Sequence, residues 1–314
     1  QVDTIYKKKY YIIQNTKKIG GSFIRLVLLI GISYIILLPI ITKLSSSFML
    51  QKDLYDPTVK WIPSHFTFTN YIEVWNHMKY PQAFLNSFFL SVIVSMLQVI
   101  SCTIVGYGFA RFHYWGSNIL FGIVIFMLIV PPQVTLIPLY LNFHYFNLFG
   151  LIPGSGFDLL DTYWPFILMA ITATGLKNGL FIYIMRQFFK GMPRVLEEAA
   201  YVDGAGPFKT FYKIMLPGAI PPIIVIFLFS FVWQWNDALL TSIFLKNKVL
   251  LANTLNRLIF SMSPDLGNTS HMTAQYISLI NNTGMLLFIL PLITLYVFLQ
   301  RYFIESVTRT GIVG

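Results

Sequence analysis

The side chains best suited to binding a small polar molecule stand together in the sequence WQWND, residues 233–237. A tryptophan ring can cover the C–H face of a sugar, and neighbouring amide and carboxylate groups can hydrogen-bond its hydroxyls. The alternative is an aromatic belt at a membrane boundary, together with simple helix packing. The candidate binding residues of this stretch are Gln234, Trp235, Asn236 and Asp237.

A second polar set follows one face of the apolar run 83–109, where polar residues recur at helical spacing. Polar groups inside a membrane usually face the interior of a helix bundle or a wet cavity, so we expect the long side chain of Gln98 to line a path. Small and hydroxyl residues also let helices pack closely, which is the competing interpretation for the other members. The set consists of Ser91, Ser95, Gln98 and Cys102.

A third polar cluster, Asn281, Asn282 and Thr283, stands at the start of the last apolar run. It could form the mouth of a path for a solute, or it could cap the helix, and the residues alone do not separate these two interpretations.

Motifs for nucleotide, metal or covalent chemistry are absent from the sequence. The phosphate-binding loop G-x-x-x-x-G-K-[ST] needs the dipeptide Gly-Lys, which occurs nowhere in the chain. There is likewise no H-E-x-x-H, no G-x-S-x-G and no His pair at ligand spacing, and the single Cys102 cannot form an intramolecular disulfide. We therefore predict no catalytic residue, no metal site and no cofactor bound by this chain.

The elements that must position these residues are apolar helices. The chain has 314 residues, is 56% hydrophobic and has repeated apolar runs of about the 20 residues that a membrane-spanning helix needs. We expect an all-α membrane protein with six transmembrane helices, the fourth interrupted by Gly175, Lys177 and Gly179. The predicted spans are 22–44, 83–109, 118–141, 163–189, 217–241 and 278–300.

The distribution of basic residues predicts the orientation, because cytoplasmic loops retain Lys and Arg. One side of the predicted topology carries about two thirds of the 22 Lys and Arg residues, and that side includes both termini. Both termini are therefore expected in the cytoplasm. The net charge of +10 is explained by topology and anionic lipid, so it does not predict a nucleic-acid partner.

The predicted organisation is a basic cytoplasmic tail at 1–21, followed by a membrane domain at 22–314 that ends in a short cytoplasmic tail at 301–314. The outer segments, near 45–82, 142–162 and 242–277, are rich in Pro, Gly and Asn and predict loops and surface helices.

The insert at 190–216 is charged and interrupted by glycines, although it lies between two apolar runs. Pro193 suits a first helical turn, and the two following glutamates favour the positive end of a helix dipole. Two glycines in DGAGP, residues 203–207, predict a sharp bend before a second helix. The first helix carries Glu197, Glu198, Ala199 and Ala200, and we expect the two alanines to form a smooth patch.

The second helix of the insert is expected to have an apolar stripe of Phe208, Phe211, Tyr212 and Met215, with Lys209 and Lys213 directed elsewhere. A bent pair of short helices can fit a groove of a partner protein, which favours docking over chemistry. The alternative is a plain connector with interfacial helices.

The insert resembles the EAA signature of the inner-membrane permease subunits of ABC importers. The matching residues are Glu198, Ala199, Ala200, Gly204, Ile214, Leu216 and Pro217 at the signature's spacing. Flanking stretches, IMRQFFKGMP, PPQVTLIPLYL and WQWNDALL, are similar to the carbohydrate-uptake branch that includes the maltose permeases. The final RTGIVG and the NNT at 281–283 depart from that pattern.

The resemblance implies a type I ABC importer permease fold in a bacterial inner membrane, with the 197–217 loop as the coupling helix. It implies a second, similar permease subunit, two cytoplasmic ATPase subunits that hold ATP and Mg²⁺, and an extracellular or periplasmic solute-binding protein. The transported solute would be a carbohydrate, an oligosaccharide or a related polyhydroxylated molecule. Three rival functions remain open: a permease for another solute, an intramembrane enzyme, and an ATPase-independent channel or secondary transporter. The coupling residues it assigns are Glu197, Glu198, Ala199, Ala200, Asp203, Gly204, Gly206, Phe208, Ile214, Leu216 and Pro217.

Overall fold

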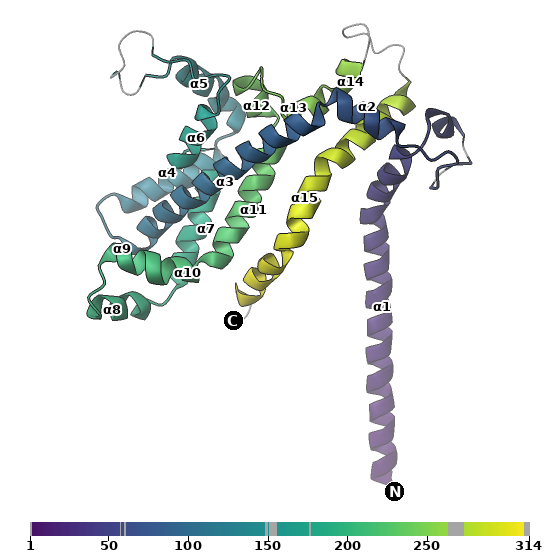
Figure 1. The fold of residues 1–314 in the computed structure, drawn as a ribbon. Coiled ribbons are helices and arrows are strands. Elements are labelled where there is room, and N and C mark those ends of the chain that lie inside the picture. Colours follow the sequence, from purple (N-terminus) through teal and green to yellow (C-terminus); the bar gives the residue numbers. More distant parts are fainter. Residues whose placement is uncertain are drawn as a thin grey trace. The chain divides into compact units, whose positions relative to one another are not determined.

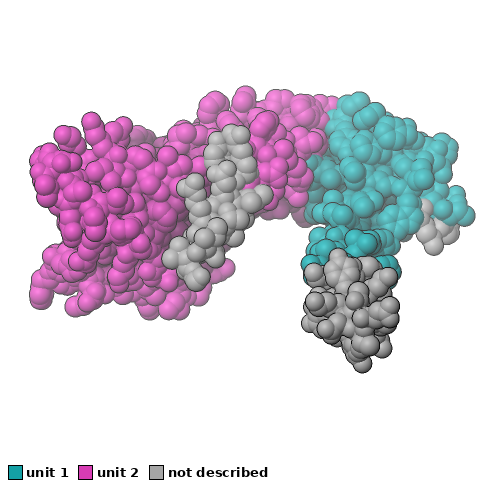
Figure 2. All heavy atoms as spheres, turned by 90° about the horizontal axis from the view of Figure 1, so that it is seen from below, with its two compact units in different colours: residues 1–74, 263–286 teal, residues 75–262, 287–314 magenta. Residues whose placement is uncertain are grey.

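The computed structural model describes residues 2–56, 58–59, 61–147, 150, 156–175, 177–262 and 273–310, with the side chains of 2–20 and 301–310 left out. Its elements are helices, and within these ranges strand-like pairing is limited to two isolated β-bridges. The chain divides into two compact units, 1–74 with 263–286 and 75–262 with 287–314 (Figure 2). The predicted loop residues 263–272 and the last four residues of the predicted tail lie outside the described ranges.

Unit 1 contains α1 (Val2–Ser47), the short 3-10 helix η1 (Gln51–Tyr55), most of α2 (Thr69–His77) and the start of α15 (Ala274–Thr310). The predicted first span, 22–44, lies within α1, which already begins at Val2. Asp53 is buried in this unit and accepts hydrogen bonds from the backbone N–H and the ring Nδ1 of His65, at 2.9 and 2.7 Å. The buried charge is therefore balanced by local donors.

Unit 2 is a helix bundle around α3 (Tyr80–Arg111), which packs against α6, α7 and α11 (Figure 1). The helices α8 to α10 lie at one end of this bundle, and α5 and α12 lie at the other (Figure 1). The helices that follow α3 in this unit are α4 (Ser117–Ile129), α5 (Pro132–His144), α6 (Trp164–Ile171), α7 (Asn178–Gly191), α8 (Val195–Val202), α9 (Pro207–Thr210), η3 (Phe211–Met215), α10 (Leu216–Gly218), α11 (Ile220–Asn236), α12 (Leu239–Phe244), α13 (Leu251–Asn256) and α14 (Leu258–Met262).

Gly106 allows α3 to approach α7 closely. A Cβ atom at Gly106 would lie 2.6 Å from the Cβ of Met185 and 3.1 Å from the backbone nitrogen of Arg186. Because backbone and Cβ atoms cannot move aside as a flexible side chain would, any larger residue would push the two helices apart.

Two hydrophobic clusters stabilise unit 2 along the length of α3. One contains Leu90 and Val94 of α3 with Phe166 and Phe244, and the other contains Cys102 and Tyr107 with residues of α7 and α11. Gln98 lies between these two parts of α3, so a long polar side chain stands between the two hydrophobic clusters.

Three of the six predicted spans, 118–141, 163–189 and 217–241, are not continuous helices in the structure. Among the described residues, three helices are long and apolar enough to cross a membrane, and five candidates result if each of two bent helix pairs counts as one span. The pair α4 and α5 bends by 105°, where Pro131 and Pro132 end one helix and begin the next. The α10–α11 break gives a 74° bend near Ala219, so the predicted helix 217–241 is also interrupted and ends at Asn236.

The predicted fourth span, 163–189, consists of two helices, α6 and α7. The break falls at the residues that interrupt the apolar pattern, since α6 ends at Ile171 and α7 begins at Asn178 after a turn in which the Asn178 N–H donates to the Gly175 carbonyl oxygen. The interruption was thus correctly predicted, and it is a complete break between two helices.

Candidate functional site

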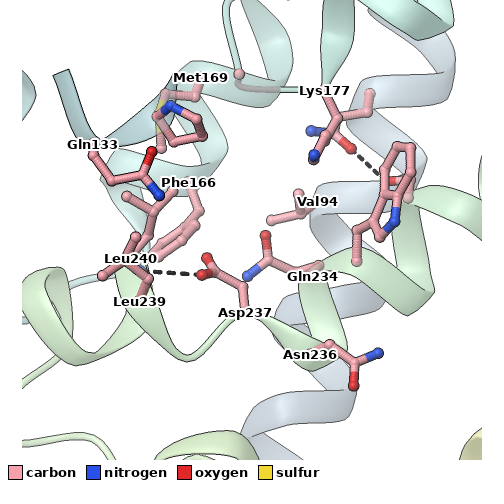
Figure 3. A pocket seen from close by; sticks show the side chains of 15 residues that line it. Val94, Gln133, Phe166, Met169, Lys177, Gln234, Asn236, Asp237, Leu239 and Leu240 are labelled. Carbon is pink, nitrogen blue, oxygen red and sulfur yellow. Dashed lines mark hydrogen bonds between the residues drawn. The ribbon is translucent and has the colours of Figure 1, made fainter. Parts of the chain in front are cut away.

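A cavity of about 340 Å³ lies within unit 2 between α3, α5, α6, the end of α11 and the start of α12, with Gly175 and Lys177 before α7 on its wall (Figure 3). We call it the central cavity. The side chains of Gln133, Gln234 and Asp237 point into it, with Lys177 on a different wall (Figure 3). Its polar lining residues are Gln98, Gln133, Lys177, Ser230, Gln234, Asn236 and Asp237.

Gln98 lies on the wall of the central cavity, as its position in the second predicted span suggested. The hydroxyl of Ser230 on α11 donates to its Oε1 atom, and this bond joins the two helices beside the cavity. The other three members of the predicted polar face do not line this cavity. Ser95 donates to the Ser91 carbonyl oxygen at 2.6 Å, and the buried Cys102 thiol lies 3.8 Å from the Asn178 carbonyl oxygen, so packing explains them better.

Trp235 lies outside the central cavity, which agrees with the alternative of helix packing and not with a plate for a sugar. Its side chain is 1% exposed, its Nε1 donates to the Phe288 carbonyl oxygen at 3.2 Å, and its ring stacks on Phe231. Residues two apart on a helix point to nearly opposite faces, so Trp233 lines the cavity instead.

The Trp233 ring is positioned by aromatic and cationic neighbours. It stacks on Phe181 and Phe229 with centroid distances of 5.5 and 5.7 Å, and the Nζ atom of Lys177 lies 4.9 Å from its centroid. An aromatic face beside a cation and several amides can contact both the apolar and the polar parts of a hydroxylated molecule.

Asp237 has the partner that the sequence left unnamed. Its Oδ1 accepts a hydrogen bond from the backbone N–H of Leu240 at 3.0 Å, which fixes the first turn of α12. Asn236 is turned away in Figure 3, and its Nδ2 donates to the Val232 carbonyl oxygen at 2.7 Å. The Nε2 of Gln234 is buried and has no hydrogen-bond partner among the described residues, so this amide could donate to a ligand.

Lys177, Gln133 and Ser230 were missed as candidates. Lys177 carried a usable signal, because a lone charge inside an apolar run usually marks a polar interior. The sequence pattern assigned it only an interrupting role. Gln133 and Ser230 carried no comparable signal, since single polar residues also occur on ordinary helix faces.

Asn281 and Asn282 are in unit 1, within α15, which begins at Ala274, so the capping interpretation is wrong. Asn282 joins α15 to α1: its Oδ1 accepts from the Lys43 Nζ and its Nδ2 donates to the Ser46 Oγ, both at 3.1 Å. Thr283 is buried and donates to the Leu279 carbonyl oxygen at 2.9 Å. Asn282 also lines a smaller cavity of about 310 Å³ in the same unit.

The insert forms the predicted bent pair, α8 followed by α9, which continues through η3 into α10. We call residues 193–218 the α8–α10 segment. Gly204 has φ +76°, a left-handed conformation that few other residues adopt easily, and the Ala205 N–H donates to the Ala200 carbonyl oxygen at 2.9 Å to close the end of α8. Gly206 precedes α9 with an ordinary φ of −76°, and Pro207 begins α9.

The two neighbouring glutamates of α8 have different environments. Glu197 is buried: its Oε1 accepts from the Tyr107 hydroxyl at 2.9 Å, and its Oε2 lies 3.4 Å from the Arg111 Nε. The Arg111 Nη2 also donates to the Met192 carbonyl oxygen at 2.7 Å. Glu198, in contrast, is exposed. Glu197 therefore holds α8 to the end of α3, and Glu198 remains available to a partner.

The outer surface of the α8–α10 segment differs from the predicted one. Ala200 is buried, so only Ala199 of the expected alanine patch is exposed. The predicted apolar stripe divides: Met215 is buried with Phe211 packed beside it, whereas Phe208 is 91% exposed and Tyr212 is also exposed. Five residues, 211–215, form a π-helix, whose wider turn changes the register on which the stripe was predicted.

The other predicted coupling residues take several positions in the segment. Ile214 packs at the edge of the buried cluster, Leu216 is partly buried, and Asp203 and Pro217 are exposed. Among the described residues, no group of three or more His, Cys, Asp or Glu side chains comes together as a metal site.

Within the described residues, these features define a mostly helical protein that combines helices long and apolar enough to cross a membrane, a cavity with polar lining and a pair of short helices at one end of the bundle. The chain belongs to the family of binding-protein-dependent transport system inner membrane components, whose model matches residues 102–309. The match includes most of the central cavity and the whole α8–α10 segment.

Characterised relatives cover most of the chain. It is 31% identical to the alpha-glucoside transport system permease protein AglG of Rhizobium meliloti over 80% of this chain, and it spans 62% of that relative's length. It is 30% identical to the osmoprotective compounds uptake permease protein GgtD of Synechocystis, covering 89% of this chain and 88% of the relative. Identity to the arabinooligosaccharides transport system permease protein AraQ of Halalkalibacterium halodurans is 28%, with 90% and 93% covered.

The fold is also similar to a solved one. A chain of a bacterial ABC transporter involved in the import of the acidic polysaccharide alginate superposes with a TM-score of 0.72 at 20% identity, covering 92% of this chain and 98% of the other. The likeness shows a shared fold of an ABC importer.

Proposed function

We propose that this chain is the permease subunit that forms the translocation path for a carbohydrate, an oligosaccharide in particular, in an ATP-driven importer. The path would include the central cavity. Its amides and the Trp233 ring suit a polyhydroxylated solute, and the names of the relatives AglG and AraQ refer to transport of an alpha-glucoside and of arabinooligosaccharides.

The proposed topology has six membrane crossings. They are the apolar part of α1, α3, the bent pair α4 and α5, the broken pair α6 and α7, α11 with the helix before it, and α15. Broken helices are tolerated in a membrane where their free backbone groups are buried in protein or line a cavity, and the bends here adjoin the central cavity at Pro132 and Gly175. The excess of Lys and Arg supports cytoplasmic termini.

The α8–α10 segment would dock in a groove of a cytoplasmic ATPase subunit. Its exposed Phe208 and Tyr212 are apolar anchors of the kind that a helix presents to a groove, and the exposed Glu198 could pair with a basic residue there. ATP and Mg²⁺ would be held by two such ATPase subunits. A second, similar permease subunit and an external solute-binding protein would complete the transporter.

A single observation carries the proposal: α3 holds both sites. Gln98 lines the cavity, and Tyr107 and Arg111 of the same uninterrupted helix hold Glu197 of α8. Gln98 and Arg111 are roughly 20 Å apart along the helix axis at 1.5 Å per residue. A movement of the docked segment would therefore reach the cavity through one rigid element, as alternating access between two states requires.

The test is uptake by the assembled transporter in proteoliposomes. The chain is reconstituted with its cognate permease, ATPase and binding protein, ATP is enclosed on the ATPase side, and uptake of a labelled oligosaccharide is measured. We expect uptake that needs ATP, the binding protein and an ATPase with an intact phosphate-loop lysine.

Other outcomes would assign the chain differently. Flux in the absence of the ATPase would indicate a channel or secondary transporter, and chemical conversion of a solute would indicate an enzyme. ATP-dependent uptake of a different solute, matched by the ligand of the binding protein, would keep the transporter and replace the carbohydrate.

A further inference from the structure

A second cavity, of about 580 Å³, lies in unit 2 beside the start of the α8–α10 segment and takes no part in the proposed transport path. We call it the basic cavity. It is formed by the end of α3, the turn at 112–116, the first turn of α4, and α7. Its charged and polar lining includes Arg111, His113, Asn118, Arg186, Lys190 and Arg194.

The positive charge of the basic cavity is poorly balanced. Arg111 is paired with Glu197, but within the described part of the chain Arg186, Lys190 and Arg194 form no ion pair. The Nε of Arg186 is buried and lacks a hydrogen-bond partner among the described residues, while its guanidinium lies 3.8 Å from the centroid of the Phe121 ring. A pocket with several unpaired cations and a buried free donor is suited to an anion with several oxygen atoms.

The surroundings of the cavity point to the membrane interface. The turn at 112–116 carries Phe112, Tyr114 and Trp115, all exposed, with Trp115 97% exposed. Exposed aromatic side chains of this kind concentrate at the level of the lipid headgroups.

An apolar strip leads away from the cavity along α4. Ile119 lines the cavity, and Ile119, Ile123 and Phe126 are exposed at intervals of four and three residues, which places them on one face. A basic pocket continuous with an exposed apolar helix face matches both parts of a phospholipid, the headgroup and an acyl chain.

From these observations we propose that the basic cavity binds the phosphate-bearing headgroup of an anionic phospholipid from the bilayer. Basic pockets between membrane helices on the cytoplasmic side commonly hold such headgroups. Only the choice of the cytoplasmic leaflet rests on the proposed function, through its orientation; binding itself does not depend on transport. The bound lipid would hold α4, α7 and the start of α8 together.

The test uses the purified full chain in detergent, titrated with phosphatidylglycerol or phosphatidylcholine and followed by native mass spectrometry. We expect phosphatidylglycerol to bind preferentially. Arg186→Gln with Lys190→Gln should weaken its binding by roughly 30-fold, because each basic residue near anionic lipid contributes about a five-fold gain in binding. The matched control, Lys246→Gln with Lys248→Gln, removes the same charge outside the cavity and should bind like the unchanged protein.

A second variant leaves Arg186 unchanged, because Arg186 packs on Phe121 and its replacement could misfold the protein. Lys190→Gln with Arg194→Gln removes two exposed charges and should weaken phosphatidylglycerol binding to a similar degree. Equal binding of the two lipids, or equal loss in the control pair, would overturn the proposal.

Two further results would assign the cavity to another anion. Displacement of phosphatidylglycerol by glycerol phosphate or inorganic phosphate at comparable concentration would indicate a soluble phosphate. Unchanged lipid binding in the variants, together with loss of ATPase association, would indicate an acidic protein surface. Because lipid binding is measured on the chain alone, its failure leaves the transport proposal standing, and the reverse also holds.

Discussion

The α8–α10 segment and the central cavity, both in unit 2, differ in the partners of their polar side chains. In the segment, both carboxylate oxygens of Glu197 have a partner, the Tyr107 hydroxyl and the Arg111 guanidinium, although the buried Arg111 Nε makes no hydrogen bond within the described residues. In the cavity, the Gln234 Nε2 has no partner within the described residues, and Lys177 contacts a ring instead of a carboxylate. Saturated polar groups fix a structure, whereas groups with free capacity can bind a ligand. The comparison indicates that the Glu197 site fixes the position of α8, whereas the central cavity has polar groups that can bind a ligand.

The largest expected effect follows from removing the buried carboxylate of Glu197. Glu197→Ala leaves Arg111 and Tyr107 buried without their partner, and losing one member of a buried ion pair costs about 3 kcal/mol or more. We expect a clear fall in the melting temperature of the purified protein and loss of uptake.

Glu198→Ala is the matched control, because it removes the neighbouring, exposed carboxylate. It should leave the melting temperature unchanged and weaken only ATPase association in a pull-down. If the two variants melt alike, Glu197 does not anchor α8.

A smaller effect is expected at the bend of the segment. Gly204→Asp places a side chain at φ +76°, which costs about 1–2 kcal/mol in the left-handed region, and it adds a charge to the docking surface. The protein should stay in the membrane while ATPase association and uptake both fall.

Gly206→Asp adds the same charge at an ordinary φ and should reduce association less, since aspartate is favoured before a helix. An undiminished pull-down with intact uptake in Gly204→Asp would refute the docking role of the bend.

The smallest effect is expected in the cavity. Gln98→Leu removes the acceptor of the Ser230 hydroxyl and one amide from the wall, so uptake should fall by about five- to ten-fold, as expected when a hydrogen bond worth about 1 kcal/mol or slightly more is lost. Assembly with the ATPase should be unaffected. Ser95→Ala, on the same helix but bonded only to the Ser91 carbonyl oxygen, should transport normally. Loss of assembly in Gln98→Leu would make this residue structural.

Local rules predicted the segment better than the cavity. The bend at 203–206, the helix beginning at Pro207 and the break around Gly175 follow from Pro and Gly chemistry over a few residues. The predicted apolar stripe from Phe208 to Met215 was wrong because a π-helix altered the helical register. No residue pattern in the sequence indicated that change.

The cavity depends on residues far apart in the chain, from Gln98 to Asp237. Sequence spacing could therefore indicate candidate residues, but it could not predict which of them lie close together in the fold. Trp233 and Trp235 show the limit most clearly. They were indistinguishable as neighbours in WQWND, yet one lines the cavity and the other donates to Phe288.

The contact at Gly106 restricts where motion can occur. With the α3 backbone set against the Cβ of Met185 and the amide of Arg186, there is no intervening side chain that could change rotamer and let the helices slide. The two helices should swing together as one rigid body, and the hinges would then be the turn that follows α6 and the 105° bend between α4 and α5.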